Sequence, residues 1–173
     1  LHPTIKRISL DMSNDSPNAL VGLGHNITRV KALRALLKQI QPDIALAMMT
    51  TANVILALAS WGLSSIKTIG SSRNHPPQRP VGRLWHVLRK FTYGMLDANT
   101  AMSSEGRDWI KQYTFANRVV AMPNPVSWPL PVLEPLIPPP TVNRKRIIGV
   151  GRLVEVKGFA VLIDAFAKLA EKY

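Results

Sequence analysis

A proline-rich stretch over residues 123–140 constrains the fold of this chain more than any other feature. It holds eight prolines: Pro123, Pro125, Pro129, Pro131, Pro135, Pro138, Pro139 and Pro140. Proline lacks the backbone N–H and clashes with the preceding turn of a helix, so neither a helix nor a central strand can run through the stretch. The 173 residues therefore predict a domain over residues 1–122, a linker over residues 123–143, and a strand followed by a helix over residues 144–173.

Apolar residues before this stretch alternate between strand and helix patterns. The expected strands are Ile5–Leu10, Asp43–Met49, Ile66–Ser71, Ala98–Ser103 and Arg118–Met122. The expected helices are Asn26–Ile40, Thr50–Trp61, Val81–Leu96 and Ser104–Tyr113, with Thr50 and Ser104 as N-caps. Because strands that alternate with helices form parallel sheets, the pattern predicts an α/β fold with a parallel Rossmann-like sheet and flanking helices on both of its faces.

The uncharged run Ile44–Ile66 is long enough to suggest a membrane span. Thr50, Thr51 and Asn53 interrupt this run, and Pro42 and Asp43 before it are typical of the entry to a strand. A strand buried on both faces, followed by a crossover helix, explains the run better than a membrane span does.

The segment Val81–Leu96 combines an apolar stripe with the cations Arg83, Arg89 and Lys90. A basic amphipathic helix of this kind can lie on a membrane surface. The same pattern is typical of a helix that packs its stripe on a sheet and turns its basic side to solvent. The sequence alone favours this second interpretation.

Beyond the prolines, Arg146–Val150 has the pattern of a short apolar strand, and apolar residues then recur at helical spacing from Phe159 to Leu169. Between strand and helix stand Gly151, Arg152 and Lys157. A turn that opens a helix favours anions through its amide groups and the helix dipole, and two cations strengthen that preference. The sequence therefore predicts a phosphate-binding turn. One strand and one helix cannot bury both their faces, so this unit either packs on the first domain or belongs to a larger one.

The chain is strongly basic, with 22 Lys and Arg against 10 Asp and Glu and a formal charge of +12. Such an excess favours nucleic acid, anionic lipid surfaces or phosphorylated small molecules, although a basic proteome or a missing acidic segment would also produce it. Nucleic acid has no support beyond charge, because no binding motif accompanies it. The absence of cysteine excludes disulfides and thiolate metal sites and fits a reducing compartment.

Several short motifs in a fixed order resemble a family-4 glycosyltransferase (glycosyl transferases group 1) of the two-Rossmann-domain type called GT-B. They are Gln41-Pro42-Asp43-Ile44, Ser72-Arg73-Asn74, Asp97-Ala98, Ser103-Ser104-Glu105, Pro123-Asn124-Pro125-Val126, Gly149-Val150-Gly151-Arg152-Leu153 and Lys157-Gly158. Each motif alone is weak, but their order and spacing are specific and cover the chain from about Val30 to its end. The Ser-Arg-Asn motif is also similar to members that make bacterial surface or lipid-linked glycans.

The resemblance implies that Gly151, Arg152 and Lys157 bind the diphosphate of a nucleotide-sugar donor. This agrees with the physics, because breaking the sugar bond leaves negative charge on the diphosphate, which fixed cations stabilise without a metal ion. The spacing does not fit a Walker loop, and Val154 stands where a dinucleotide fingerprint needs its third glycine.

Arg73 and Asn74 follow a predicted strand at its carboxyl end, where the resemblance places the acceptor side of an inter-domain cleft. They are candidates for contact with the acceptor or with a phosphate on it. Alternatively, Asn side-chain bonds simply hold the loop. The adjacent His75 is interpreted as an exposed residue, and Asn124 as a residue that shapes the turn at the crossing between domains.

The sequence also departs from the family. It lacks the spaced glutamates that contact the donor sugar and nucleotide, and it lacks the family's first strand and glycine-rich loop. We therefore expect a chain that is incomplete at both ends and inactive by itself, with unknown catalytic residues. The function implied by resemblance is transfer of a hexosyl or N-acetylhexosaminyl group from a nucleotide-diphosphate sugar to a glycan or lipid-linked acceptor, with retention and with no metal or cofactor.

Such an enzyme would be cytoplasmic, on the inner face of the plasma membrane, where its basic excess meets anionic lipid. The alternative is a non-catalytic remnant that binds anions or a partner protein.

Overall fold

The computed structural model describes residues 4–10, 19–74, 82–126, 128–129 and 147–170. The chain divides into two compact units, Leu1–Ser127 and Trp128–Tyr173. The boundary between the units falls within the proline-rich stretch.

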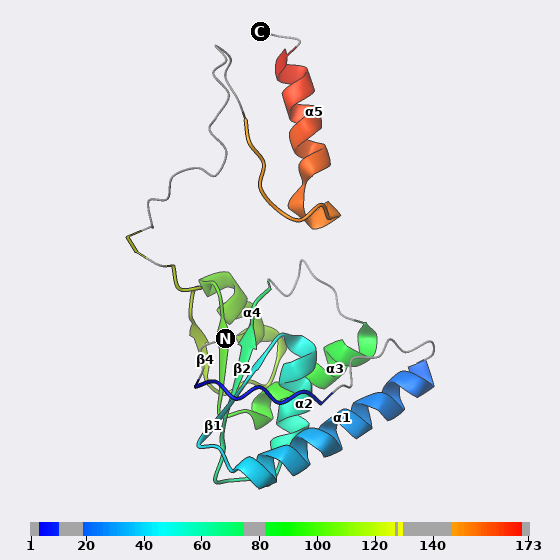
Figure 1. The fold of residues 1–173 in the computed structure, drawn as a ribbon, viewed down its shortest axis with the longest axis vertical. Coiled ribbons are helices and arrows are strands. Elements are labelled where there is room, and N and C mark those ends of the chain that lie inside the picture. Colours follow the sequence, from blue (N-terminus) through cyan, green and yellow to red (C-terminus); the bar gives the residue numbers. More distant parts are fainter. Residues whose placement is uncertain (1–3, 11–18, 75–81, 127, 130–146, 171–173) are drawn as a thin grey trace. The chain divides into compact units, whose positions relative to one another are not determined.

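The first unit is built on a four-stranded parallel sheet whose spatial order follows the sequence, β1-β2-β3-β4 (Figure 1). The strands are β1 (Ile44–Met48), β2 (Lys67–Ser72), β3 (Ala98–Ala101) and β4 (Val119–Ala121). The helices are α1 (Ala19–Ile40), α2 (Thr50–Ser60), α3 (Arg83–Thr92) and α4 (Ser104–Tyr113), and the short 3-10 helix η2 (Tyr93–Met95) follows α3. In the register, Leu46 pairs with Ile69, Ile69 with Ala98, and Asn99 with Val119. The predicted α/β class with a Rossmann-like parallel sheet is therefore confirmed.

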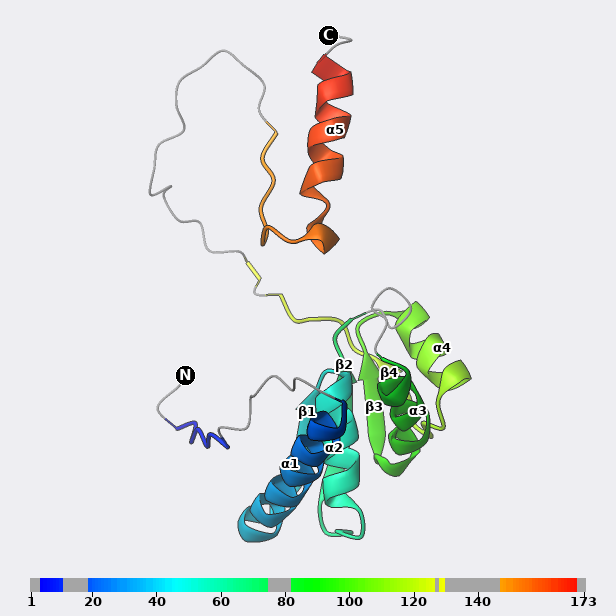
Figure 2. The same ribbon diagram turned by 90° about the vertical axis from the view of Figure 1, so that its right-hand side faces the viewer.

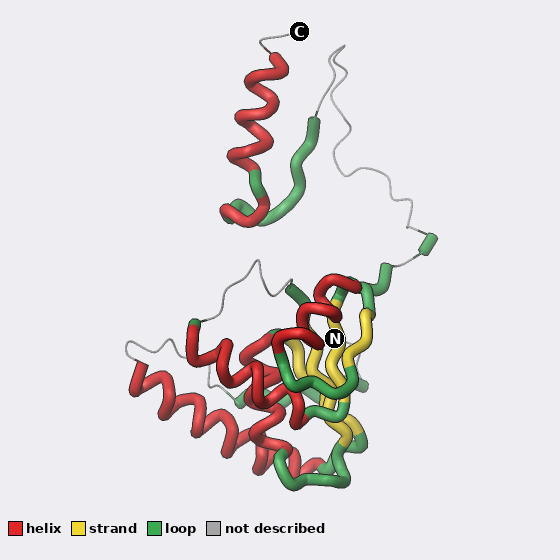
Figure 3. Tube along the Cα trace, turned by 180° about the vertical axis from the view of Figure 1, so that it is seen from behind, coloured by secondary structure: helices red, strands yellow, loops and turns green. Residues whose placement is uncertain are grey.

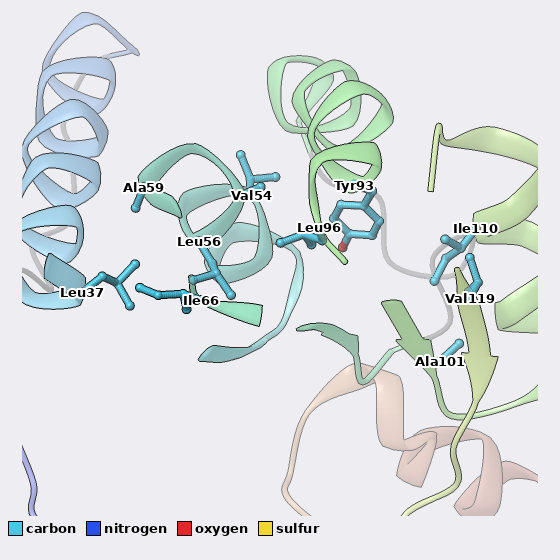
Figure 4. Packing of buried hydrophobic residues seen from close by; sticks show 11 residues of the cluster. Leu37, Val54, Leu56, Ala59, Ile66, Tyr93, Leu96, Ala101, Ile110 and Val119 are labelled. Carbon is cyan, nitrogen blue, oxygen red and sulfur yellow. The ribbon is translucent and has the colours of Figure 1, made fainter. Parts of the chain in front are cut away.

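The helices and the sheet of this unit form two layers. Every connection steps to the next strand in the same direction, and right-handed crossovers then place the connecting helices on one face of the sheet. Figure 3 shows α1, α2 and α3 beside the strands while α4 overlaps them in this view, and in Figure 2 α1, α2 and α3 lie in front of the strands. The core lies between the layers, and its buried residues are Leu37, Val54, Leu56, Ala57, Ala59, Ile66, Tyr93, Leu96, Ala101, Ile110 and Val119 (Figure 4).

The opposite face of the sheet carries exposed apolar side chains. Ile44, Leu46 and Met48 of β1 are each at least 51% exposed, while Ala45 and Ala47 between them are half-buried. The expectations that helices cover both faces of the sheet and that this strand is buried on both faces are therefore wrong for the part of the chain that the structure describes. The reason is that helices α1 to α4 all lie on one side, so that only alternate residues of β1 meet them.

Three local expectations also differ from the structure. Residues 5–10 carry no regular secondary structure, so the strand predicted there is wrong. The N-cap of α2 is Met49, without a side-chain capping bond, and not Thr50. The N-cap of α4 is Ser103 and not Ser104, because Ser103 has the extended backbone that a cap requires and its Oγ accepts a hydrogen bond from the Gly106 N–H at 3.2 Å.

The second unit contains the 3-10 helix η3 (Glu155–Lys157) and the helix α5 (Phe159–Ala170). The helix predicted from Phe159 is confirmed, whereas Ile147–Val150 forms no strand. A strand needs a neighbour for its backbone donors and acceptors, and the described residues of this unit offer none. The apolar residues Val161, Ile163 and Phe166 of α5 are exposed, so this unit does not bury the apolar side chains of its helix.

Candidate functional site

The turn before α5 is packed around the ring of Phe159. A Cβ atom added at Gly149 would lie 2.9 Å from Cε1 of Phe159, and one added at Gly151 would lie 3.5 Å from its Cζ. Both glycines therefore let the backbone pass close to the first residue of α5. This contact holds the predicted anion-binding turn against the amino end of the helix, although the strand expected before it is absent.

Arg152 and Lys157, the two cations of this turn, are both exposed. A Cβ atom added at Gly151 would lie 3.7 Å from Cδ of Lys157. The Lys157 side chain therefore runs back along the turn to Gly151, the residue before Arg152. Gly158 has a left-handed backbone with φ 67°, and its C=O accepts from the Leu162 N–H at 3.0 Å. Lys157 therefore stands directly before the first turn of α5, whose leading N–H groups lack helical partners.

One carboxylate belongs to the same turn. Glu155 is exposed and begins η3, and its C=O accepts from the Gly158 N–H at 2.9 Å. Its negative charge offsets one of the two cations. The turn therefore offers a modest positive charge and a helix amino end to an anion.

In the first unit, the carboxyl ends of all four strands meet at one edge of the sheet, which is the position where open α/β sheets bind ligands. Arg73 and Asn74 follow β2 at this edge, as the sequence predicted. Nη1 of Arg73 donates to Oδ1 of Asn124 at 2.6 Å, and Nδ2 of Asn74 lies 3.7 Å from the sulfur of Met49. Each of the two side chains therefore contacts a residue that follows another strand. This geometry fits the alternative that the two residues hold the loop, and Asn124 has a definite structural partner.

A buried polar cluster beneath this edge was not expected from the sequence. Asn53 of α2 is fully buried; its Oδ1 accepts from the Ser71 N–H at 3.2 Å and its Nδ2 donates to the Tyr93 hydroxyl at 3.0 Å. Oγ of Ser72 lies 3.4 Å from the same hydroxyl. The cluster holds Ser71 and Ser72, the last residues of β2, in place and so fixes the position of the Arg73 backbone that follows them. The only sign of this cluster in the sequence is Asn53, a lone amide in an apolar helix, which is interpreted above as an interruption of the uncharged run Ile44–Ile66.

Met49 links β1 to α2 in a strained conformation, with φ 79° and ψ 153°. Its N–H donates to the Ser71 C=O at 2.9 Å, and its C=O accepts from the Asn53 N–H at 3.0 Å. Because a residue other than glycine is disfavoured here by about 1–3 kcal/mol, the surrounding bonds must impose this conformation. Strained backbone of this kind concentrates at functional sites. Within the first unit, the carboxyl edge of the sheet beside Arg73 and Asn74 is therefore a better candidate for a ligand site than the amino edge.

Asp97 lies at the start of β3, at the opposite edge of the sheet. Oδ2 accepts from the Thr68 N–H at 2.8 Å and from the Thr68 hydroxyl at 2.9 Å, and Lys67 Nζ lies 3.4 Å from Oδ1. These bonds from Thr68, followed by Lys67, lower the pKa of Asp97. The Asp97-Ala98 motif therefore joins two strands and does not reach the candidate site.

Two other observations concern the part of the chain that the structure describes. No cluster of three or more His, Asp or Glu that could hold a metal ion occurs within residues 4–10, 19–74, 82–126, 128–129 and 147–170. No helix among these residues is long and apolar enough to cross a membrane. His75 and most of the linker lie outside the described residues.

No family model matches the chain, and a search of curated proteins finds no match. The structure therefore defines a Rossmann-like α/β fold followed by a short second unit. The two candidate sites on it are the turn with Arg152 and Lys157 and the sheet edge with Arg73 and Asn74.

Proposed function

We propose that this chain takes part in glycosyl transfer from a nucleotide-diphosphate sugar to a glycan or lipid-linked acceptor. The observation that carries the proposal is the turn before α5, where Arg152 and Lys157 are exposed and the Lys157 side chain runs beside Gly151. The motif order that resembles GT-B glycosyltransferases supports the same function, and retention of configuration follows from that resemblance alone.

The donor side of the proposal rests on charge. As the sugar bond breaks, the diphosphate leaves with growing negative charge, which positioned cations and helix amides stabilise. Arg152 offers a planar group that can donate two parallel hydrogen bonds to phosphate oxygens, and Lys157 offers a point charge at the start of α5. Within the described residues, neither cation forms an ion pair.

The acceptor side of the proposal rests on Arg73 and Asn74. The guanidinium of Arg73 has five N–H donors, and its bond to Asn124 uses one of them. Its other donors can bind an acceptor phosphate or hydroxyl. Asn74 contacts Met49, the residue before α2. The amino end of α2 has no side-chain cap, so its free N–H groups can also bind an acceptor phosphate or hydroxyl.

The donor site can be tested by titrating the chain with UDP and with GDP in a calorimeter. Arg152→Ala and Lys157→Ala should each weaken binding about tenfold, the loss expected for a hydrogen bond to a charged group. Glu155→Gln should strengthen binding, because it removes the opposing carboxylate from the turn. Lys168→Ala, which removes a cation near the far end of α5, is the matched control and should leave binding unchanged.

Equal losses in Lys168→Ala and Lys157→Ala would contradict the donor site, because they would show that only the overall charge matters. The second candidate function is a non-catalytic protein that binds anions or a partner, and the internal contacts of Arg73 and Asn74 favour it. In that case inorganic pyrophosphate should bind as tightly as UDP, since no nucleoside would be recognised.

A further inference from the structure

Helix α3 turns an apolar stripe toward solvent. Leu84, Val87 and Phe91 are spaced three and four residues apart, so they lie on one face of the helix, and each is at least 51% exposed. Trp85 and Leu88 on a neighbouring face pack against the core instead. The sequence favoured a stripe that faces the sheet, and for these three residues that interpretation is wrong.

The stripe is exposed because α3 buries Arg89 instead of these three apolar side chains. Arg89 is only 4% exposed, its Cζ lies 4.4 Å from the centroid of the Trp109 ring, and its Nη2 lies 3.1 Å from Nδ1 of His86. This burial lowers the pKa of Arg89. With the guanidinium of Arg89 held over the α4 tryptophan, the face of α3 that carries Leu84, Val87 and Phe91 is exposed to solvent.

The stripe continues onto a neighbouring loop. The rings of Phe91 and Phe115 are 5.3 Å apart, and Lys90 Nζ lies 5.6 Å from the centroid of the Phe115 ring. The Phe115 N–H donates to the Lys90 C=O at 2.9 Å, which fixes the loop against the helix. We call the exposed residues Leu84, Val87, Phe91 and Phe115, with the flanking cations Arg83 and Lys90, the α3 patch.

The charged residues of the α3 patch itself are cations, and the segment of sequence that contains α3 is basic. Asp43 is the only acidic residue between Ser16 and Leu96, whereas that segment contains ten Lys and Arg. Among the described residues, neither Arg83 nor Lys90 has an acidic partner within ion-pair distance. An exposed apolar stripe within such a basic region fits a surface that is apolar in its interior and negatively charged outside.

We propose that the α3 patch docks on a membrane surface that contains anionic lipids. Phe91 and Phe115 enter the boundary between headgroups and acyl chains, while Arg83 and Lys90 bind lipid phosphates. A partner protein is the alternative occupant, but two exposed cations without an acidic partner among the described residues, placed beside an exposed apolar stripe, favour an anionic lipid surface. The proposal does not depend on glycosyl transfer, since it uses none of the residues assigned to donor or acceptor.

The test is sedimentation of the chain with vesicles of phosphatidylcholine alone and of phosphatidylcholine mixed with phosphatidylglycerol. Binding should require phosphatidylglycerol and weaken with salt. Lys90→Glu should lower the partition coefficient about 25-fold, because each charge near such a surface contributes about fivefold and the substitution changes the charge by two units. Phe91→Ser should lower it about tenfold through the lost ring.

Two matched controls distinguish binding through the α3 patch from non-specific binding through any exposed aromatic or cationic side chain. Trp61→Ser removes an aromatic side chain that is 74% exposed at the end of α2, and Lys38→Glu reverses an exposed cation at the end of α1. Both should retain most of the binding, and circular dichroism should show all four variants folded. Equal losses in Lys38→Glu and Lys90→Glu, or no binding to anionic vesicles, would overturn the proposal. A dimer that dissociates in Phe91→Ser, without vesicle binding, would also overturn it.

Discussion

At the scale of single residues, the described cations play different parts. Arg34 donates to the carbonyls of Ala59 and Trp61 at 2.8 and 2.6 Å, and Arg89 is stacked on a tryptophan, so these guanidinium groups hold the fold together. Arg152 and Lys157 are exposed and lack ion pairs within the described residues. Arg152 and Lys157 can therefore bind a ligand without first breaking an ion pair.

Asp97 gives a prediction about pH. Its pKa is lowered in the folded chain, first by the Thr68 N–H and hydroxyl and then by Lys67, so its charged form stabilises the fold above the unfolded pKa of about 3.9. This stability should be lost as the pH falls through the lower, folded pKa. Denaturant unfolding between neutral and strongly acidic pH should therefore show a steeper loss of stability for the original chain than for Asp97→Asn.

The order of the causes can be tested separately. Thr68→Val keeps the N–H bond and removes the hydroxyl, and it should raise the pKa of Asp97 more than Lys67→Met does. The pKa can be followed by NMR titration of the Asp97 carboxyl. Identical acid profiles for the original chain and Asp97→Asn would show that the Thr68 bonds do not persist in solution.

At the scale of elements, the buried cluster of Asn53, Tyr93 and Ser72 joins α2, η2 and β2. Tyr93→Phe should reduce the free energy of unfolding by about 1–3 kcal/mol, because it leaves the buried Nδ2 of Asn53 without its acceptor. Asn53→Ala should cost at least as much, because it removes the acceptor of the Ser71 N–H and the donor to the Tyr93 hydroxyl.

Exposed counterparts provide the controls for these two variants. Tyr113→Phe and Asn117→Ala remove the same chemical groups at exposed positions and should change stability by less than about 0.5 kcal/mol. Chemical denaturation of the four variants measures the difference. If the buried and exposed pairs cost the same, the cluster does not hold the end of β2.

Periodicity was enough to predict most elements of the first unit, including α2 and β2, because apolar spacing reports directly on which face is buried. It failed for Ile147–Val150, since a strand also needs a neighbouring strand, which no local pattern encodes. The position of Arg73 at the carboxyl end of β2 was predictable from the strand before it. Its bond to Asn124 was not, because the partner is 51 residues away and depends on how the strands are ordered.

At the scale of the whole molecule, the first unit is a parallel sheet with helices on one face. Parallel sheets are normally covered on both faces. Here Ile44, Leu46 and Met48 present apolar side chains on the other face, and the register continues this face through Ile69 of β2 to Ala98 of β3. The stability of the unit must therefore come mainly from the helical side.

Two leucines test this imbalance because they have the same chemistry at different depths. Leu56 of α2 is 3% exposed, whereas Leu46 of β1 is 54% exposed. Leu56→Ala should lower the free energy of unfolding by about 2–5 kcal/mol, as removal of a buried leucine does, and Leu46→Ala should lower it by less than about 1 kcal/mol. Denaturant unfolding at several protein concentrations measures both costs. If Leu46→Ala proves as costly as Leu56→Ala, the face is covered in solution, and a cost that grows with protein concentration would identify another copy of the chain as the cover.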